Sequence, residues 1–174
     1  MLKEKLKDYN IILASGSPRR QEFFKQLDLD FEIRLKEVEE IYPQELQHSE
    51  ISDYLAQLKT LPFKDELQDK DILITSDTIV WLDNIAIGKP KDEEHAFKMI
   101  KSLCDNTHEV ITSVCFTSKA FQKTVNCITK VTFKPLTDEE IWYYINNFKP
   151  MDKAGAYGCL LYTSPSPRDL NPNL

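Results

Sequence analysis

The hydrophobic positions along the chain follow two periods, which predict strands interleaved with helices. Short β-branched runs bounded by turn residues are typical of buried strands, and apolar residues three or four positions apart are typical of one helix face. Strands are predicted at 11–14, 31–35, 71–75, 79–82, 85–87, 109–117 and 125–133. Helices are predicted at 18–27, 49–59, 91–103 and 138–147. The last two strands are expected to pair as a long hairpin, so the pattern predicts an α/β fold with a mixed β-sheet flanked by helices.

Polar residues mark where two of these helices begin. Thr137 precedes the helix 138–147 and Glu140 follows three residues later, which is the sequence signature of a capping box. Ser49 is the candidate N-cap of the helix 49–59. We therefore expect both helices to begin at these polar residues.

Composition narrows the class of protein without identifying it. The chain has 174 residues, of which 41% are hydrophobic and 29% charged, as is ordinary for a single globular domain. A net charge of -6 argues against sequence-independent nucleic-acid binding, although it leaves room for a small basic pocket. No apolar run approaches the ~20 residues of a membrane span, and the charged first residues do not resemble a signal peptide. We expect a cytoplasmic protein that binds neither membranes nor nucleic acid.

The cysteines and histidines give no metal or disulfide pattern. The four cysteines are Cys104, Cys115, Cys127 and Cys159, and they form no C-x-x-C pair. No histidine stands at ligand spacing from them, so we expect reduced thiols and no structural zinc. His108, directly followed by Glu109, is interpreted as part of a surface or strand-edge pair.

The residues after Gly158 depart from the pattern. Three of the nine prolines fall in the last 16 residues, and no usable periodicity remains. Such a run is either a flexible native tail or a non-native addition. We favour the second interpretation, because the run begins like the in-frame translation of a sequencing-library adapter. We therefore expect a domain over 1–158 that is incomplete at its C-terminus, and a non-native tail over 159–174.

Two arginines stand where a helix start favours acids. Arg19 and Arg20 fall in the first turn of the helix predicted to begin at Pro18, with Ser17 as its candidate cap. A helix start carries a partial positive charge, so basic residues there are electrostatically unfavourable. An anion held by helix N–H groups, serine hydroxyls such as that of Ser15, and the guanidinium groups would resolve the conflict. The alternative is an exposed basic turn, and this segment alone leaves both interpretations open.

Acidic residues offer a second candidate constellation. Asp77 follows the strand predicted at 71–75, where α/β proteins bind ligands, and it could orient water, hold a metal or form an Asx-turn. The cluster of Glu37, Glu39 and Glu40 is usually a solvated loop. Together with Asp77, however, one of these glutamates could complete an oxygen-ligand site for Mg²⁺.

A lysine with a restricted backbone follows the acidic segment. Lys89 lies between Gly88 and Pro90, which could direct its ammonium group toward a phosphate. Such lysines are usually solvated, and the spacing of a Walker loop is absent. Lys89 is therefore a weak candidate on its own.

Five ordered segments resemble one known family. They are 14–20, 76–80, 88–90, 107–110 and 152–158. In these segments the chain resembles the Maf family of nucleoside triphosphate pyrophosphatases, over about residues 11–158. The resemblance implies a Maf/ITPase-like fold with a substrate groove between lobes. It also implies hydrolysis between the α- and β-phosphates of a nucleotide with a divalent cation, Mg²⁺ or Mn²⁺, and it suggests a homodimer.

The resemblance also assigns roles to individual positions. The phosphate-binding and charge-neutralising positions of the family fall on Ser15, Arg19, Arg20, Lys59 and Lys89. Glu40 matches the metal-site glutamate, and Asp77 matches the general base, which also joins the metal site. Thr78 and Arg19 match positions linked to substrate choice, and Asp77-Thr78 resembles the branch that prefers dTTP and UTP.

One departure from the family pattern keeps other hypotheses open. After Gly158 the family usually continues with Ile-Gln, whereas this chain has Cys159-Leu160 and lacks the glutamine that helps to select the base. We expect an exposed sheet edge and exposed apolar surface as a result. Two alternatives to an active enzyme are a nucleotide-binding regulator of cell division with little catalysis, and an inactive fragment.

Overall fold

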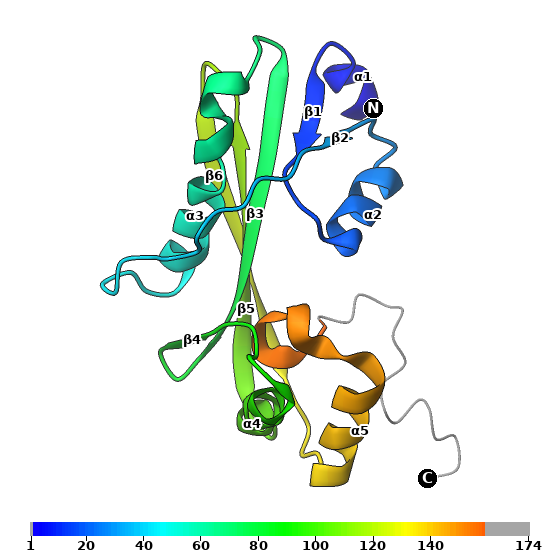
Figure 1. Ribbon diagram of the computed structural model, residues 1–174, viewed down its shortest axis with the longest axis vertical. Helices are drawn as coiled ribbons and strands as arrows, with labels where there is room; N and C mark the ends of the chain where they lie inside the picture. The colour runs from blue at the N-terminus through cyan, green and yellow to red at the C-terminus, as the bar shows by residue number, and fades with distance from the viewer. Residues whose placement is uncertain (1, 159–174) are drawn as a thin grey trace. The chain divides into compact units, whose positions relative to one another are not determined.

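The strands form one mixed sheet. The computed structural model describes residues 2–158, and its six-stranded sheet has the order β2-β1-β3-β5-β6, with β4 paired to β3. The strands are β1 (Asn10–Leu13), β2 (Glu32–Ile33), β3 (Asp71–Leu82), β4 (Ile85–Ile87), β5 (Thr107–Thr117) and β6 (Gln122–Thr132). β1 pairs in parallel with β2 and β3, and β4 pairs antiparallel with β3. The predicted α/β fold with a mixed sheet and a long β5–β6 hairpin is confirmed (Figure 1).

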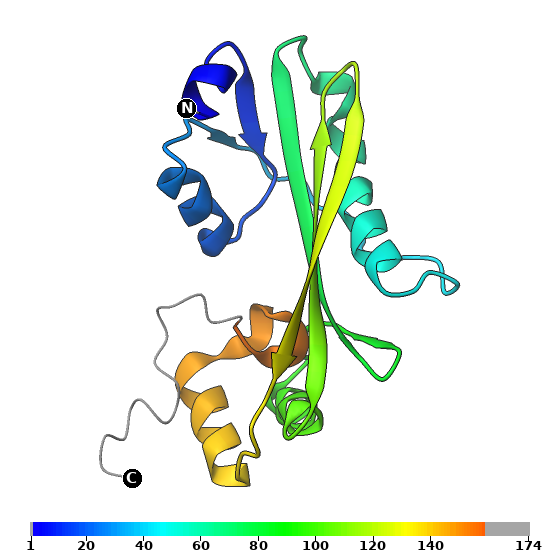
Figure 2. The ribbon, with the colours of Figure 1, turned by 180° about the vertical axis from the view of Figure 1, so that it is seen from behind.

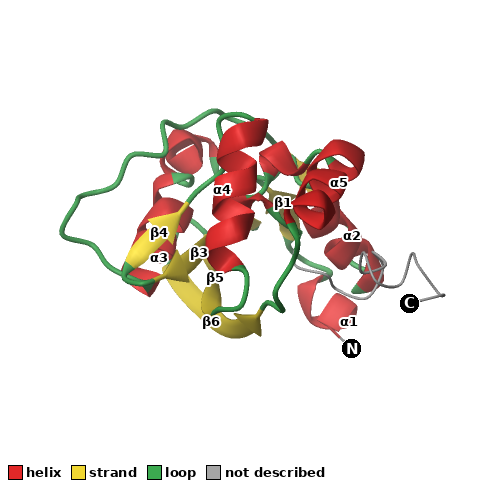
Figure 3. Ribbon diagram, turned by 90° about the horizontal axis from the view of Figure 1, so that it is seen from below, coloured by secondary structure: helices red, strands yellow, loops and turns green. Residues whose placement is uncertain are grey.

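Four helices lie at the predicted places, whereas the helix α1 and three shorter 3₁₀ turns were not predicted. The α-helices are α1 (Leu2–Leu6), α2 (Pro18–Gln26), α3 (Ser49–Leu58), α4 (Glu93–Leu103) and α5 (Asp138–Phe148). The 3₁₀ turns are η1 (Leu61–Glu66), η2 (Pro150–Asp152) and η3 (Ala154–Ala156). Figure 3 shows these helical segments in red. Between residues 2 and 158, no helix is both long and apolar enough to cross a membrane.

The chain divides into two compact units. The first unit comprises residues up to Thr78 together with 111–128, and the second comprises 79–110 together with the residues from 129 onward. β3, β5 and β6 therefore contribute residues to both units. The substrate groove predicted between lobes stays a prediction.

The first unit packs its core beside β1 and β3. Ile12, Phe63, Leu67 and Leu73 form a buried cluster. α3 is attached to β3 by the Thr75 hydroxyl, which donates to the Ala56 carbonyl at 2.6 Å. Figures 1 and 2 show α1 and α2 on one side of β3 and α3 on the other.

The second unit is built on α4 and α5. Ile141 and Ile145 of α5 are completely buried in a cluster with Ala96, Met99 and Ile100 of α4. The predicted capping box is confirmed at the start of α5. The Glu140 N–H donates to the Thr137 hydroxyl at 3.3 Å, and the Thr137 N–H donates to the Glu140 carboxylate at 2.8 Å.

The predicted N-cap of α3 was wrong by one residue, and the predicted start of α4 was wrong by two. Ser49 is the first helical residue of α3, and the N-cap is His48, whose φ is 53°. The Glu50 carboxylate accepts the Gln47 N–H at 3.0 Å and so closes the turn before the helix. α4 begins at Glu93 rather than at residue 91, because the Asp92 side chain caps it by accepting the His95 N–H at 2.7 Å.

The strand predictions needed larger corrections. The runs predicted at 71–75 and 79–82 form one twelve-residue strand, β3. The side chains of Asp77 and Thr78 bond to other elements and do not turn back on their own backbone, so the strand continues through them. The strand predicted at 31–35 shrinks to Glu32–Ile33.

The interpretation of His108 as a surface or strand-edge residue was wrong. Only 1% of His108 is exposed, since Phe133 and Tyr157 pack edge-on against its ring. The alternation along β5 points this side chain toward the core of the second unit. The period of the strand was visible in the sequence, but a histidine gave no signal that it faced inward.

Among the described residues β2 and β6 are the ends of the sheet order, and Val125 and Ile128 of β6 are exposed. That an edge is left exposed by the departure after Gly158 stays a prediction. The apolar face predicted for the helix 18–27 is only partly covered, since Phe24 packs against Phe31 while Phe23 and Leu27 are exposed. The predicted non-native tail over 159–174 lies outside the described residues.

Candidate active site

A cavity of about 370 Å³ opens in the first unit. Its walls come from the turn after β1, the start of α2, the segment after β2, the residue after α3, η1 and β3. The lining residues are Ala14, Ser15, Gly16, Arg20, Leu35, Lys36, Glu37, Val38, Glu40, Lys59, Phe63 and Ser76. This volume falls in the range of small-molecule sites. The cavity brings together four of the predicted site residues, Ser15, Arg20, Glu40 and Lys59.

One ammonium group joins the two predicted metal-site carboxylates. Lys59 follows α3 and places Nζ 2.6 Å from Asp77 Oδ1 and 3.1 Å from Glu40 Oε1. Only 19% of the Lys59 side chain and 9% of the Asp77 side chain are exposed, whereas 43% of Glu40 is exposed. Asp77 reaches this position from the middle of β3 rather than from beyond its end, which corrects the predicted placement.

Arg20 lies beside this group and bonds to β3. Its Nη1 donates to the Ser76 carbonyl at 2.9 Å and to the Ser15 hydroxyl at 3.4 Å, and its Nη2 donates to Thr78 Oγ1 at 3.3 Å. Burial lowers the pKa of Arg20 from its ordinary value, and the charge of Asp77 opposes that shift. Because a guanidinium group has five N–H donors, these three bonds leave donors for an anionic ligand.

The start of α2 has no side-chain cap. Ser17 is the N-cap residue, but its side chain makes no capping bond, and Pro18 occupies the first turn as predicted. The Ser17 N–H instead donates to the Ser15 hydroxyl at 3.3 Å. Backbone N–H groups at the start of a helix and nearby guanidinium groups are suited to holding an anion. Arg19 is exposed at this helix start.

Four predicted site residues are not among those that line the cavity: Arg19, Asp77, Thr78 and Lys89. The Thr78 hydroxyl is shared between Arg20 and Thr112, whose Oγ1 lies 3.0 Å away. Lys89 is exposed and belongs to the second unit, following β4. The roles of Thr78 and Lys89 therefore stay predictions.

No pattern in the sequence marked the apolar residues of the cavity. Leu35, Val38 and Phe63 form an apolar part of its wall. Lys36 is fixed there by the Pro62 carbonyl at 2.8 Å and by Glu66, and its Nζ lies 5.1 Å from the centre of the Phe63 ring. These partners are separated from Lys36 by 26 or more residues, so no local motif marks them.

The acidic groups fit a cation that is shared with a ligand. Within residues 2–158, no three His, Cys, Asp or Glu side chains gather closely enough to hold a metal ion by themselves. Glu40 and Asp77 supply two carboxylates from different segments. Mg²⁺ is usually bound by one or two carboxylates plus substrate phosphates and water, so this pair fits such an ion.

The mixed sheet and its charged cavity define an α/β protein with a site suited to a small phosphorylated ligand. Residues 10–162 match the family described as Maf-like protein, and the chain belongs to that family. It is 66% identical over 158 residues to the dTTP/UTP pyrophosphatase of Flavobacterium johnsoniae, and the match covers 91% of this chain and 81% of the relative. The dTTP/UTP pyrophosphatase of Flavobacterium psychrophilum is 60% identical with the same coverage.

A solved structure shares the fold at low identity. The Staphylococcus aureus Ham1 protein aligns with a TM-score of 0.51 and 16% identity over 70% of each chain. At this identity the likeness supports the fold alone. It agrees with the predicted Maf/ITPase-like architecture.

Proposed function

We propose that this protein hydrolyses dTTP and UTP to the nucleoside monophosphate and pyrophosphate. Family membership and the activity named for relatives at 66% and 60% identity support this proposal. The observation that carries it is the pairing of the Lys59 ammonium group, which lines the cavity beside Arg20, with the carboxylates of Glu40 and Asp77. Such a set of cations and carboxylates is what attack of water on a polyphosphate requires.

In this proposal Asp77 is the general base. Its carboxylate receives the proton of the water molecule that attacks the phosphorus atom. A carboxylate that is largely buried beside a cation is well placed to orient water, because few other solvent molecules compete for it. We further propose that the free N–H groups of Arg20, the Ser15 hydroxyl and the N–H groups at the start of α2 bind phosphate oxygens.

The divalent cation, Mg²⁺ or Mn²⁺, would be held by Glu40 and Asp77. When bound, it neutralises charge on the phosphoryl oxygens and polarises them. Lys59, Arg19 and Lys89 add positive charge in this proposal, and Thr78 with Arg19 contributes to substrate choice. The Asp77-Thr78 pair and the relatives' names both favour thymidine and uridine nucleotides.

The domain boundary, the location and the oligomeric state extend the same proposal. We assign the catalytic domain to 1–158, and the family match ends four residues beyond that boundary, at residue 162. An enzyme acting on free nucleotides belongs in the cytoplasm, and a second copy of this chain stays a predicted partner.

A pyrophosphate-release screen tests the proposal. The eight canonical ribo- and deoxyribonucleoside triphosphates should be supplied with Mg²⁺ or Mn²⁺, and products separated to tell pyrophosphate from orthophosphate. We expect dTTP and UTP to be hydrolysed fastest and to yield monophosphate plus pyrophosphate. Release of orthophosphate alone contradicts the proposal, and nucleotide binding without any product favours the regulator hypothesis.

A matched pair of arginine variants locates the activity in the cavity. Arg20→Met removes the guanidinium group beside Asp77, and we expect pyrophosphate release to fall by about 10² to 10³-fold. Arg34→Met is the control, because Arg34 pairs with Glu32 near the surface. Equal activity in the two variants would place the reaction elsewhere.

A further inference from the structure

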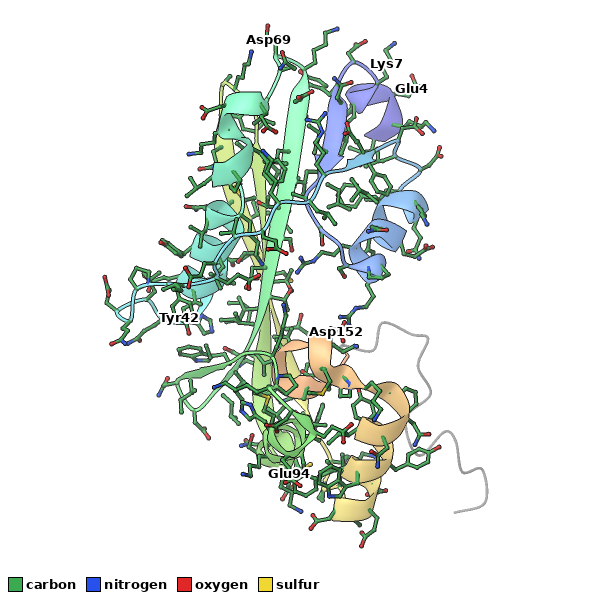
Figure 4. The ribbon with its side chains drawn as sticks, viewed as in Figure 1. Glu4, Lys7, Tyr42, Asp69, Glu94 and Asp152 are labelled. Atoms are coloured by element: carbon green, nitrogen blue, oxygen red, sulfur yellow. The ribbon has the colours of Figure 1, made fainter. Side chains whose placement is uncertain are left out.

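The Lys59 ammonium occupies the position between the two carboxylates that the proposed cation needs. Nζ lies within 3.1 Å of one oxygen from each carboxylate, Asp77 Oδ1 and Glu40 Oε1. These carboxylates come from β3 and from the segment between β2 and α3, so a single cation joins two separate parts of the first unit. Figure 4 labels Tyr42, which lies in the same segment as Glu40.

The ammonium group and a divalent cation would use the same pair of carboxylates. Each binds carboxylates through electrostatic attraction, and neighbouring cations repel one another strongly where solvent is excluded. Because most of the Asp77 and Lys59 side chains are shielded from water, that repulsion is weakly screened. The two cations therefore compete for this carboxylate pair.

A bound nucleotide changes the balance of this competition. A Mg²⁺ or Mn²⁺ ion brought with a triphosphate gains phosphate ligands that an isolated ion lacks. The triphosphate also gives an ammonium group a new set of anionic partners. Nucleotide binding consequently favours the metal at the carboxylates and the ammonium at the phosphates.

We propose that Lys59 is an internal counter-cation that holds the metal-binding carboxylates of the empty enzyme and yields them when the metal arrives with nucleotide. This inference rests on the proposed function, because it takes Glu40 and Asp77 as the metal site. The exchange releases the carboxylate of Asp77 from its ammonium partner only when substrate is present. Lys59 therefore acts as a positioning residue as well as a source of positive charge.

Metal binding in the absence of nucleotide tests the exchange directly. Mn²⁺ binding to the full chain should be measured at one near-neutral pH by the loss of the free-ion paramagnetic resonance signal, with calorimetry as a second measurement. Lys59→Met keeps the side-chain length and removes the charge. We expect it to bind Mn²⁺ more tightly than wild type by about 10 to 100-fold, an effect as large as the loss that removing a supporting partner of a metal ligand causes but opposite in sign, because the removed group is a competing cation.

A control variant and a double variant show whether a gain in Mn²⁺ affinity arises from the contact between Lys59 and Asp77. Lys119→Met is the matched control, because Lys119 pairs with Asp69 at 2.8 Å on the surface, and its Mn²⁺ affinity should equal that of wild type. Adding Asp77→Asn to Lys59→Met should abolish the gain in affinity. Lys59→Gln replaces Lys59→Met if the latter fails to give a cooperative melting transition.

Several outcomes overturn the inference. Mn²⁺ affinity that is unchanged or weaker in both Lys59 variants contradicts it, as does a gain that survives Asp77→Asn. Undetectable Mn²⁺ binding in every variant also contradicts it. These outcomes are separate from failure of the proposed function, which is measured as the absence of pyrophosphate release by the wild-type chain with dTTP and UTP.

Discussion

Two helices of similar length, α2 and α5, differ in their capping, in the charge of their first turn and in the burial of their residues. α5 begins with a complete capping box, carries three acids in its first turn and buries Ile141 and Ile145 entirely. α2 begins with two arginines, has no side-chain cap and buries none of its residues. The capping box and the first-turn acids explain why α5 is stable. The two arginines and the missing cap of α2 are explained only by the cavity at the start of that helix. A helix that violates the rules of capping and charge thus marks the site.

The charge of α2 is balanced by residues distant in sequence. Arg20 donates to the carbonyl of Ser76, 56 positions away, and is attracted by the carboxylate of Asp77. α5 makes its corresponding bonds between residues three positions apart. Substitutions should therefore affect stability mainly at α5 and activity mainly at the start of α2.

The largest difference in stability is expected between the apolar faces of the two helices. Ile141→Ala empties a fully buried position, so we expect the free energy of unfolding to fall by about 2–5 kcal/mol. Phe23→Ala alters a side chain that is 45% exposed, and the loss should stay below about 1 kcal/mol. Urea denaturation followed by circular dichroism measures both. Equal losses would mean that α2 is packed as tightly as α5.

A glycine in the second unit, Gly155, is required by both its backbone conformation and its close neighbours. Gly155 has a φ of 70°, and a Cβ added there would lie 2.9 Å from Val80 Cγ2 and 3.2 Å from Tyr157 Cε1. Gly155→Ala should cost about 1–3 kcal/mol through overpacking and backbone strain. Gly88→Ala is the control, because nothing lies within 4 Å of its added Cβ. A chemical denaturation series in which both variants behave alike would refute this account of Gly155.

Helix capping gives a smaller effect. Thr137→Ala removes the hydroxyl that accepts the Glu140 N–H, which is the side-chain bond of the capping box, and should destabilise the protein by about 1 kcal/mol. Ser17→Ala removes a side chain that caps nothing, so its effect on the free energy of unfolding should be no more than a few tenths of a kcal/mol. Thermal melting of the two variants side by side measures the difference. A larger loss at Ser17 would show that α2 depends on its cap after all.

The smallest effect is a pH dependence of stability that arises from His108 in the second unit. Burial lowers the pKa of His108 below its ordinary value, and its Nδ1 has no hydrogen-bond partner among the described residues. The folded protein therefore takes up this proton at a lower pH than the unfolded chain, whose histidine titrates near pH 6.5. The stabilising contribution is complete above that pH and is lost as the pH falls toward the lowered pKa. Its hydrogen-bond partner at Nε2 is the hydroxyl of Tyr157, at 2.5 Å.

His108→Gln removes the titrating group and tests this directly. The free energy of unfolding of the variant should fall less steeply between about pH 6.5 and pH 5 than that of wild type. Parallel curves for the two proteins would show that His108 is not responsible for the slope.

Much of the fold could be predicted because its signals are local. The β5–β6 hairpin follows from two alternating runs separated by a short turn, and the capping box of α5 spans only four residues. The continuity of β3 through Asp77 could not be predicted. Polar side chains in a row usually indicate a turn, and only their partners on α2, on β5 and after α3 keep this strand extended.

The site was predictable in its residue types but not in its pairing. The two arginines break a local rule, so their segment could be singled out from the sequence. The contact of Lys59 with both Glu40 and Asp77 joins positions 18 and 19 residues apart and has no repeating pattern. The apolar wall formed by Leu35, Val38 and Phe63 was missed for the same reason.

The most direct test of the proposed site compares two Asp→Asn variants in the first unit. Asp77 contacts Lys59 at the cavity, whereas Asp69 pairs with Lys119 on the surface at the turn before β3 (Figure 4). The initial rate of pyrophosphate release from dTTP should fall by about 10² to 10⁴-fold in Asp77→Asn. It should be unchanged in Asp69→Asn, with both variants melting as cooperatively as wild type. A rate within a few fold of wild type for a folded Asp77→Asn protein would contradict the central claim that Asp77 activates the attacking water.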